Sequence, residues 1–251
     1  MISIIIPTCN RLGPVLRAVD SVLNQSFREF ELIVVDDGSE DKTLEFLSRY
    51  DDFRLRIFSV PHGGVAKARN FGASQARYDW LCFLDSDDVW RRHKLSEQIR
   101  YHSTYPDCVI SQTDDMWIRK SVRVNKMKKN LVGEGDIFAP SLKLCLIGCS
   151  CVMIKKSVFD AAGGFDESLE TCEDYDLWLR LTCRYPVGFV AKPLVTKFGG
   201  HADQLSKKFP MMDRYRVFAL EKLLRSGLLN EDQVKMTRTE LEIKKNILQR
   251  L

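Results

Sequence analysis

The stretch from residue 78 to residue 88 reads Tyr78-Asp79-Trp80-Leu81-Cys82-Phe83-Leu84-Asp85-Ser86-Asp87-Asp88. Its apolar run has the length of a buried strand, and it ends abruptly in three carboxylates. In α/β proteins, ligands usually bind at the ends of such strands. Because carboxylates this close repel one another, a hard divalent cation shared with a substrate's phosphates would relieve the repulsion. A solvated acidic turn or a helix cap after the strand is the alternative.

A second acidic pair favours the functional interpretation. Asp36 and Asp37 end another apolar run, residues 32–35. If both runs are strands of one parallel sheet, their carboxyl ends lie at the same edge. We therefore expect the two acidic groups to form one site.

The first half of the chain alternates short apolar runs with segments of helical periodicity. This alternation predicts an α/β fold, in which parallel strands carry helices on both faces. The expected strands are residues 3–7, 31–35, 55–60, 80–84 and 109–112. Between the first two, apolar residues from 15 to 23 recur at helical spacing, and an Ala-rich helix over 65–76 is expected to lie close to the sheet.

The pattern changes after residue 114. Residues 116–130 carry six Lys or Arg and no acidic residue, which predicts an exposed excursion. Further strands are expected at 149–154, 187–190 and 194–198, with a helix at about 173–184 and helices from 210 onward. We expect one main domain, 1–205, made of halves 1–114 and 115–205, followed by a helical extension, 206–251.

Composition narrows the class of protein. Of the 251 residues, 45% are hydrophobic and 29% are charged, which argues against disorder, and the net charge of +4 does not call for a nucleic-acid partner. No apolar stretch approaches the ~20 residues of a membrane-spanning helix, and the first residues are typical of a core strand rather than of a secretory leader. We expect a cytoplasmic chain.

Eight cysteines are many for such a chain, but no Cys-x-x-Cys pair occurs. Most are expected to be reduced, buried thiols. A zinc site built from Cys145, Cys149, Cys151 and Cys172 is disfavoured because the spacing fits no common zinc template.

Several segments together resemble one family, the glycosyltransferases of family 2, which have the GT-A fold. The motifs that carry the resemblance are Ser3-Ile4-Ile5-Ile6-Pro7-Thr8-Cys9-Asn10-Arg11, Glu31-Leu32-Ile33-Val34-Val35-Asp36-Asp37-Gly38-Ser39, Ala66-Lys67-Ala68-Arg69-Asn70, Leu84-Asp85-Ser86-Asp87-Asp88, Gly163-Gly164-Phe165-Asp166-Glu167 and Cys172-Glu173-Asp174-Tyr175-Asp176-Leu177-Trp178. Each is weak alone, but they occur in the right order over residues 1–205. Cys9 and His62 depart from the family pattern, where an aromatic residue and an Asn are common.

The resemblance implies a nucleotide-diphosphate sugar donor, most commonly a UDP-sugar, and a Mn²⁺ or Mg²⁺ ion. It implies that Asp37 accepts a hydrogen bond from the base, that Asp85 holds the ribose and that Asp87 binds the metal. The remaining implied donor-side residues are Thr8, Asn10 and Arg11 beside the nucleotide, Arg69 at the base or diphosphate, and His201 at the metal or diphosphate. Ordinary alternatives are a helix cap for Thr8 and Asn10, a surface charge for Arg69 and an exposed or structural role for His201.

The resemblance also assigns the acceptor side. Sugar transfer leaves negative charge on the diphosphate, which a cation neutralises, and the attacking hydroxyl needs a base. Asp174 is the implied base, and helix capping is its alternative role. Direct displacement would invert the anomeric configuration. We expect Trp178 to lie in the core and Trp90 to border the sugar pocket.

The acceptor is expected to be a glycan or a lipid-linked molecule of cell-surface polysaccharide synthesis. The basic segment 119–129 suits anionic headgroups or a phosphate-bearing acceptor, and a solvated loop is its alternative. Basic and apolar residues near 207–216 favour peripheral membrane contact or a homodimer.

The sequence argues against three other functions. A nucleotidyltransferase would need a Gly-rich basic segment near the amino terminus, and a dehydrogenase would need Gly-x-Gly-x-x-Gly after the first strand; the sequence has neither. A catalytically inactive nucleotide-sugar-binding protein is the third. The joint presence of Asp37, Asp85, Asp87 and Asp174 argues against it.

Overall fold

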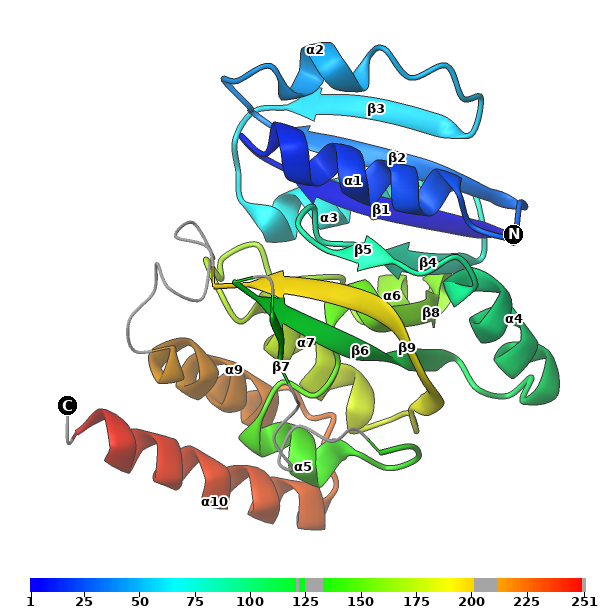
Figure 1. The fold of residues 1–251 in the computed structure, drawn as a ribbon. Helices are drawn as coiled ribbons and strands as arrows, with labels where there is room; N and C mark the ends of the chain where they lie inside the picture. Colours follow the sequence, from blue (N-terminus) through cyan, green and yellow to red (C-terminus); the bar gives the residue numbers. More distant parts are fainter. Residues whose placement is uncertain (121, 125–132, 201–211, 250–251) are drawn as a thin grey trace.

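The computed structural model describes residues 1–120, 122–124, 133–200 and 212–249 (Figure 1). One mixed sheet runs through the molecule in the order β3-β2-β1-β4-β8-β6-β9-β5, and β7 pairs with β6. The strands are β1 (Ile2–Thr8), β2 (Phe30–Asp37), β3 (Leu55–Val60), β4 (Trp80–Phe83), β5 (Val89–Trp90), β6 (Ile110–Arg119), β7 (Val122–Val124), β8 (Val152–Lys155) and β9 (Gly188–Gly199).

Helices cover both faces of this sheet (Figure 1). The described helices are α1 (Leu12–Leu23), α2 (Thr43–Leu47), α3 (Val65–Ser74), α4 (Lys94–Thr104), α5 (Phe138–Lys143), α6 (Lys156–Ala161), α7 (Glu173–Thr182), α9 (Asp213–Arg225) and α10 (Glu231–Leu248). The expected α/β class is confirmed. The sheet is mixed: the first four strands are mutually parallel and β9 is parallel to β6, but β8 runs antiparallel to both β4 and β6, and β5 runs antiparallel to β9.

Successive side chains of the central strands point to opposite faces of the sheet, so the hydrophobic core has two parts, one on each face. Ile4 packs with α1 on one face of the sheet, and its neighbour Ile5 packs with α3 on the other. Every residue of β1 and β2 is buried, as expected for parallel strands covered on both faces. Gly72 of α3 lets that helix approach closely, because a Cβ there would lie 2.5 Å from Cγ2 of Ile5.

The second half of the chain corrects three expectations. The predicted strand 149–154 opens with a 3₁₀ turn, Cys149–Cys151, before β8. The two short strands predicted at 187–190 and 194–198 are one strand, β9, whose pairing with β6 shifts register near Asp114. Strand β6 extends to Arg119 and forms a hairpin with β7, so the start of the basic excursion is ordered strand, while residues 125–132 lie outside the described residues.

Helices α9 and α10 confirm the expected helical end of the chain. Their apolar residues share one cluster with α5 and α7, which includes Phe138, Tyr175, Leu220 and Leu241. The extension therefore packs directly on the helix that carries Asp174 (Figure 1). The division at residue 205 stays a prediction. Among the described residues, no helix is both long and apolar enough to cross a bilayer.

Candidate active site

Most of the predicted donor-side residues lie at or just after the carboxyl ends of β1, β2 and β4, and Arg69 lies on α3. Parallel pairing brings Thr8 beside Asp36, and the backbone N–H of Leu84 donates to the carbonyl of Ile5, which fixes the end of β4 against β1. The fold therefore gathers the two acidic strand ends at one edge, as the sequence predicted.

Asp37 is buried, and both of its carboxylate oxygens accept hydrogen bonds from the loop between β3 and α3. Oδ1 accepts from the backbone N–H of Gly63 (2.8 Å) and Oδ2 from that of Gly64 (2.9 Å). The ring Nδ1 of His62 lies 2.9 Å from Oδ2. Gly38, at φ +72°, permits this turn, since a Cβ there would lie 2.9 Å from the backbone nitrogen of His62. The carboxylate thus shapes the loop before α3, and its contact with a base stays a prediction.

Thr8 is the last residue of β1, and Asn10 and Arg11 lie in the turn that follows. The side-chain oxygen of Asn10 accepts from the backbone N–H of Glu40 (2.7 Å), which ties this turn to the turn after β2. Oγ1 of Thr8 is buried and has no hydrogen-bond partner among the described residues. Arg11 donates to Oδ2 of Asp87 at 2.6 Å. These contacts join all three turns of the donor side.

The three clustered carboxylates lie in three different environments. Asp85 pairs with Arg69 (2.6 Å) and Asp87 with Arg11 (2.6 Å). Asp88 is buried and accepts from the Ser150 hydroxyl (2.7 Å), and burial together with its acidic neighbours raises its pKa well above the ordinary value. The repulsion expected from the sequence is therefore relieved partly by arginines and partly by this raised pKa.

The donor set fits a hard divalent cation. Magnesium is commonly held by one or two carboxylates plus substrate phosphates, so the single carboxylate of Asp87 can suffice on the protein side. The described residues contain no cluster of three or more His, Cys, Asp or Glu side chains placed to hold a metal by themselves. Asp87 remains partly exposed at 21% of its side-chain surface, so a cation can reach its carboxylate.

A buried arginine bridges the donor side to the acceptor side. Nη2 of Arg69 contacts Asp85, and Nη1 contacts Oε1 of Glu173, both at 2.6 Å. The surface-charge alternative for Arg69 is therefore wrong, because the residue is only 5% exposed. Its predicted contact with base or diphosphate stays a prediction.

Glu173 is a site residue to which sequence reasoning gave no role, although it stands beside Asp174 in the motif. Burial, and then the charge of Asp174, raise its pKa to about 7, against the opposing effect of Arg69. Its contact with Arg69 spans 104 positions of the chain, which no local pattern reveals.

Asp174 lies in the first turn of α7 and is half-buried. Its Oδ1 accepts from the backbone N–H of Tyr175 (2.7 Å), and its Oδ2 accepts from the thiol of Cys145 (3.4 Å). Cys149 lies within the electrostatic reach of both Asp85 and Asp174, whose charges help burial to raise its pKa well above the ordinary value. The ion pairs of Arg69 with Asp85 and Glu173 bring the first turn of α7, which carries Asp174, close to the donor side, and this position also suits the helix dipole.

Lys197 of β9 is a further site residue that the sequence analysis missed. Its Nζ lies 3.3 Å from Oδ2 of Asp115. Although burial acts in the opposite direction, neighbouring acidic groups, Asp115 and Asp85 among them, raise the pKa of Lys197 well above the ordinary value. Nothing in the strand pattern 194–198 distinguished it. His201, predicted at the metal or diphosphate, lies outside the described residues.

The two tryptophan expectations had different outcomes. Trp178 is in the core as predicted, at 2% exposure. The prediction for Trp90 is wrong: it is 3% exposed, and its indole N–H donates to the carbonyl of Ser150 at 2.8 Å. It packs in the core beside Lys94 instead of bordering a sugar pocket.

The sequence pattern described as Glycosyl transferase family 2 matches residues 3–162, more than half of the chain. This chain belongs to glycosyltransferase family 2. The match includes all the predicted donor-side residues except His201. It ends before α7, so Asp174 and Glu173 lie beyond it.

Relatives and solved structures agree with the family. The amylovoran biosynthesis glycosyltransferase AmsB of Erwinia amylovora is 31% identical over 83% of this chain and 75% of its own length. By contrast, the chain spans only about a third of the first uncharacterized Rickettsia glycosyltransferases that it matches, for example 32% of the one from Rickettsia felis.

The fold matches two solved glycosyltransferase structures at low sequence identity. S. aureus TarS 1–349 in complex with UDP-GlcNAc superposes with a TM-score of 0.76 at 18% identity, over 96% of this chain and 70% of TarS 1–349. The mannosyltransferase PcManGT of Pyrobaculum calidifontis, in complex with GDP-Man and Mn²⁺, gives 0.73 at 15% identity, over 96% and 68%. These likenesses confirm the predicted GT-A fold.

Proposed function

We propose that this chain is an inverting, metal-dependent glycosyltransferase that moves a sugar from a nucleotide-diphosphate sugar, a UDP-sugar in the first instance, to a hydroxyl group. The proposed acceptor is a glycan or a lipid-linked molecule of cell-surface polysaccharide synthesis. The contact that carries the proposal is the Arg69 bridge, because it joins Asp85 beside the proposed metal ligand to Glu173 beside the proposed base.

The donor side supports nucleotide binding by its polar turns. Asp37 fixes the Gly63-Gly64 loop. Arg11 pairs with Asp87 in the free protein; once a cation binds the Asp87 carboxylate, the guanidinium of Arg11 can pair with the donor's diphosphate instead. Asp87 would hold Mn²⁺ or Mg²⁺, Asp85 would hold the ribose, and the bound ion would neutralise the charge of the leaving diphosphate. PcManGT was crystallised with both a nucleotide sugar and Mn²⁺, which supports a metal in this family.

The acceptor side supports proton abstraction. In the proposed reaction, the acceptor hydroxyl attacks the anomeric carbon, the bond from that carbon to the diphosphate breaks, and the proton passes to the carboxylate of Asp174. The Arg69 bridge orients the adjacent Glu173 and so holds the first turn of α7 toward the donor. The name of AmsB supports a role in polysaccharide synthesis for this chain.

A panel of nucleotide sugars tests the proposal through the release of nucleoside diphosphate with and without Mn²⁺. We expect Asp174→Asn to lower kcat by roughly 100-fold or more while donor binding persists, because a general base contributes on that scale. The matched control is Asp160→Asn on α6, an exposed carboxylate paired with Lys156, and it should leave kcat unchanged. Normal turnover by Asp174→Asn would exclude Asp174 as the base, and donor binding without turnover by wild type would favour an inactive binding protein.

Two partner predictions stay open to experiment. The hairpin of β6 and β7 exposes Val122 and Arg123, but most of segment 119–129 lies outside the described residues, so its membrane contact stays a prediction. The homodimer stays a prediction as well.

A further inference from the structure

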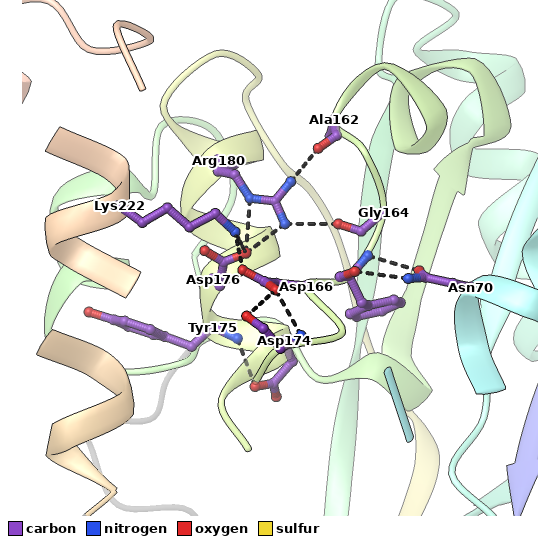
Figure 2. A network of polar contacts seen from close by, with 11 residues as sticks. Asn70, Ala162, Gly164, Asp166, Asp174, Tyr175, Asp176, Arg180 and Lys222 are labelled. Atoms are coloured by element: carbon purple, nitrogen blue, oxygen red, sulfur yellow. Dashed lines mark hydrogen bonds and ion pairs between the residues drawn. The ribbon is translucent and has the colours of Figure 1, made fainter. Parts of the chain in front are cut away.

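Helix α7 carries a further carboxylate, Asp176, which is buried and accepts a hydrogen bond from a lysine of the helical extension. Asp174 and Asp176 are two residues apart, so their side chains leave the helix about 200° apart and face different surroundings. Asp176 has 1% of its side-chain surface exposed. Its Oδ2 accepts from Arg180 (2.6 Å, Nη2) and from Lys222 of α9 (3.1 Å, Nζ) (Figure 2). A buried charge of this kind needs such partners.

Lys222 also binds the acceptor-side loop. Its Nζ donates to Oδ2 of Asp166 at 2.6 Å, so one ammonium contacts two carboxylates from different segments (Figure 2). Although burial acts in the opposite direction, hydrogen bonds from Lys222 and Ser168 lower the pKa of Asp166 to about 2. Asp166 is therefore ionised at neutral pH. If the ammonium were removed, Asp166 would lose its lysine partner, and Arg180, which contacts Asp176, would be left to balance both carboxylates.

The same network reaches the Arg69 bridge. Arg180 donates to the carbonyl of Gly164 at 2.8 Å, and the next residue, Phe165, exchanges two hydrogen bonds with the side chain of Asn70 (2.8 and 2.9 Å). Asn70 follows Arg69 on α3. Helices α3, α7 and α9 and the loop 162–168 are thus connected through hydrogen bonds (Figure 2).

We propose that Lys222 is a positioning residue for the transfer reaction: by neutralising Asp166 and Asp176 together, it sets the placement of α7 and hence of Asp174. This inference rests on the proposed function for its kinetic consequence. It assigns the helical extension a part in catalysis although α9 lies beyond the family match.

The kinetic test uses Lys222→Met in the full chain. We expect kcat to fall by roughly 10- to 100-fold, the scale of a small misplacement of a reacting group, with donor KM changed by less than about twofold. Lys222→Arg should recover most of the activity because it keeps the charge. Adding Asp166→Asn to Lys222→Met should also recover activity, because it removes the unbalanced repulsion. The matched control is Lys245→Met on α10, which removes a different lysine–carboxylate pair of the helical extension, the exposed contact with Glu221 of α9.

A second readout is independent of turnover. Amide hydrogen exchange at residues 163–168 and 173–182 should accelerate in Lys222→Met and stay at wild-type rates in Lys245→Met. The inference would be overturned if Lys222→Met had the kcat and the exchange rates of wild type. It would also be overturned if exchange accelerated across the whole chain and adding Asp166→Asn did not reverse this. If wild type turns over no donor, the proposed function fails, whereas the local exchange still decides whether Lys222 positions α7.

Discussion

At the scale of single residues, Glu173 lies between charges of opposite sign. Its pKa of about 7 exceeds the ordinary value of 4.5, so the folded protein binds this proton more tightly than the unfolded chain does. The contribution of Glu173 to the free energy of unfolding is therefore fully present below pH 4.5 and is lost as the pH rises through about 7. We predict that the free energy of unfolding of wild type, relative to Glu173→Gln, falls by up to about 3 kcal/mol from pH 4.5 to pH 8.

Urea unfolding at a series of pH values measures this difference. Asp85, whose pKa Arg69 lowers against the effect of burial, is present in both proteins, so its opposite pH dependence largely cancels. A difference that stays flat or grows with pH would show that Arg69 keeps Glu173 ionised throughout this range.

The sequence predicted the positions of residues at the strand ends, but it did not predict the side chains that these residues and Arg69 contact. Thr8, Asp37 and Asp85 follow strand ends, and strand ends can be located from apolar runs alone. The burial of Arg69 depends on Glu173, which approaches only after the chain has folded, so no local pattern could show it. Lys197 was missed for the same reason.

At the scale of elements, α10 begins with a capping box. The side chain of Asn230 accepts from the backbone N–H of Gln233 (2.9 Å), and the Gln233 side chain accepts in return from the backbone N–H of Asn230 (3.1 Å). We predict that Asn230→Ala lowers the free energy of unfolding by about 1 kcal/mol, with Asn230→Asp close to wild type. Urea denaturation measures both, and an Ala variant as stable as wild type would mean that packing on α9 alone fixes this helix.

Helices and strands with a clear hydrophobic periodicity matched their predicted positions. Strands whose length depends on pairing with a distant strand did not. Strand β3 spans residues 55–60 as predicted. The half-buried residues from Asp114 to Ile118 lack an apolar alternation, so the length of β6 became visible only through its pairing with β9.

At the scale of the whole molecule, the strand order joins the two halves into one sheet. Parallel strands before residue 84 build the donor side, and the antiparallel neighbour β8 connects them to the half that carries α7. The alternation of strands and helices predicts the parallel half. It does not predict the reversal at β8, because pairing direction depends on contacts between strands that are distant in the chain.

In the proposed function, the donor's diphosphate binds through a cation at Asp87, and the proposed base, Asp174, takes no part in that binding. Calorimetric titration of UDP with and without Mn²⁺ tests it most directly. We predict that Mn²⁺ tightens UDP binding to wild type and to Asp174→Asn alike, and that Asp87→Ala weakens the metal-dependent binding by roughly 30-fold or more, about 2 kcal/mol. Equal Mn²⁺ enhancement in Asp87→Ala and wild type would contradict the account.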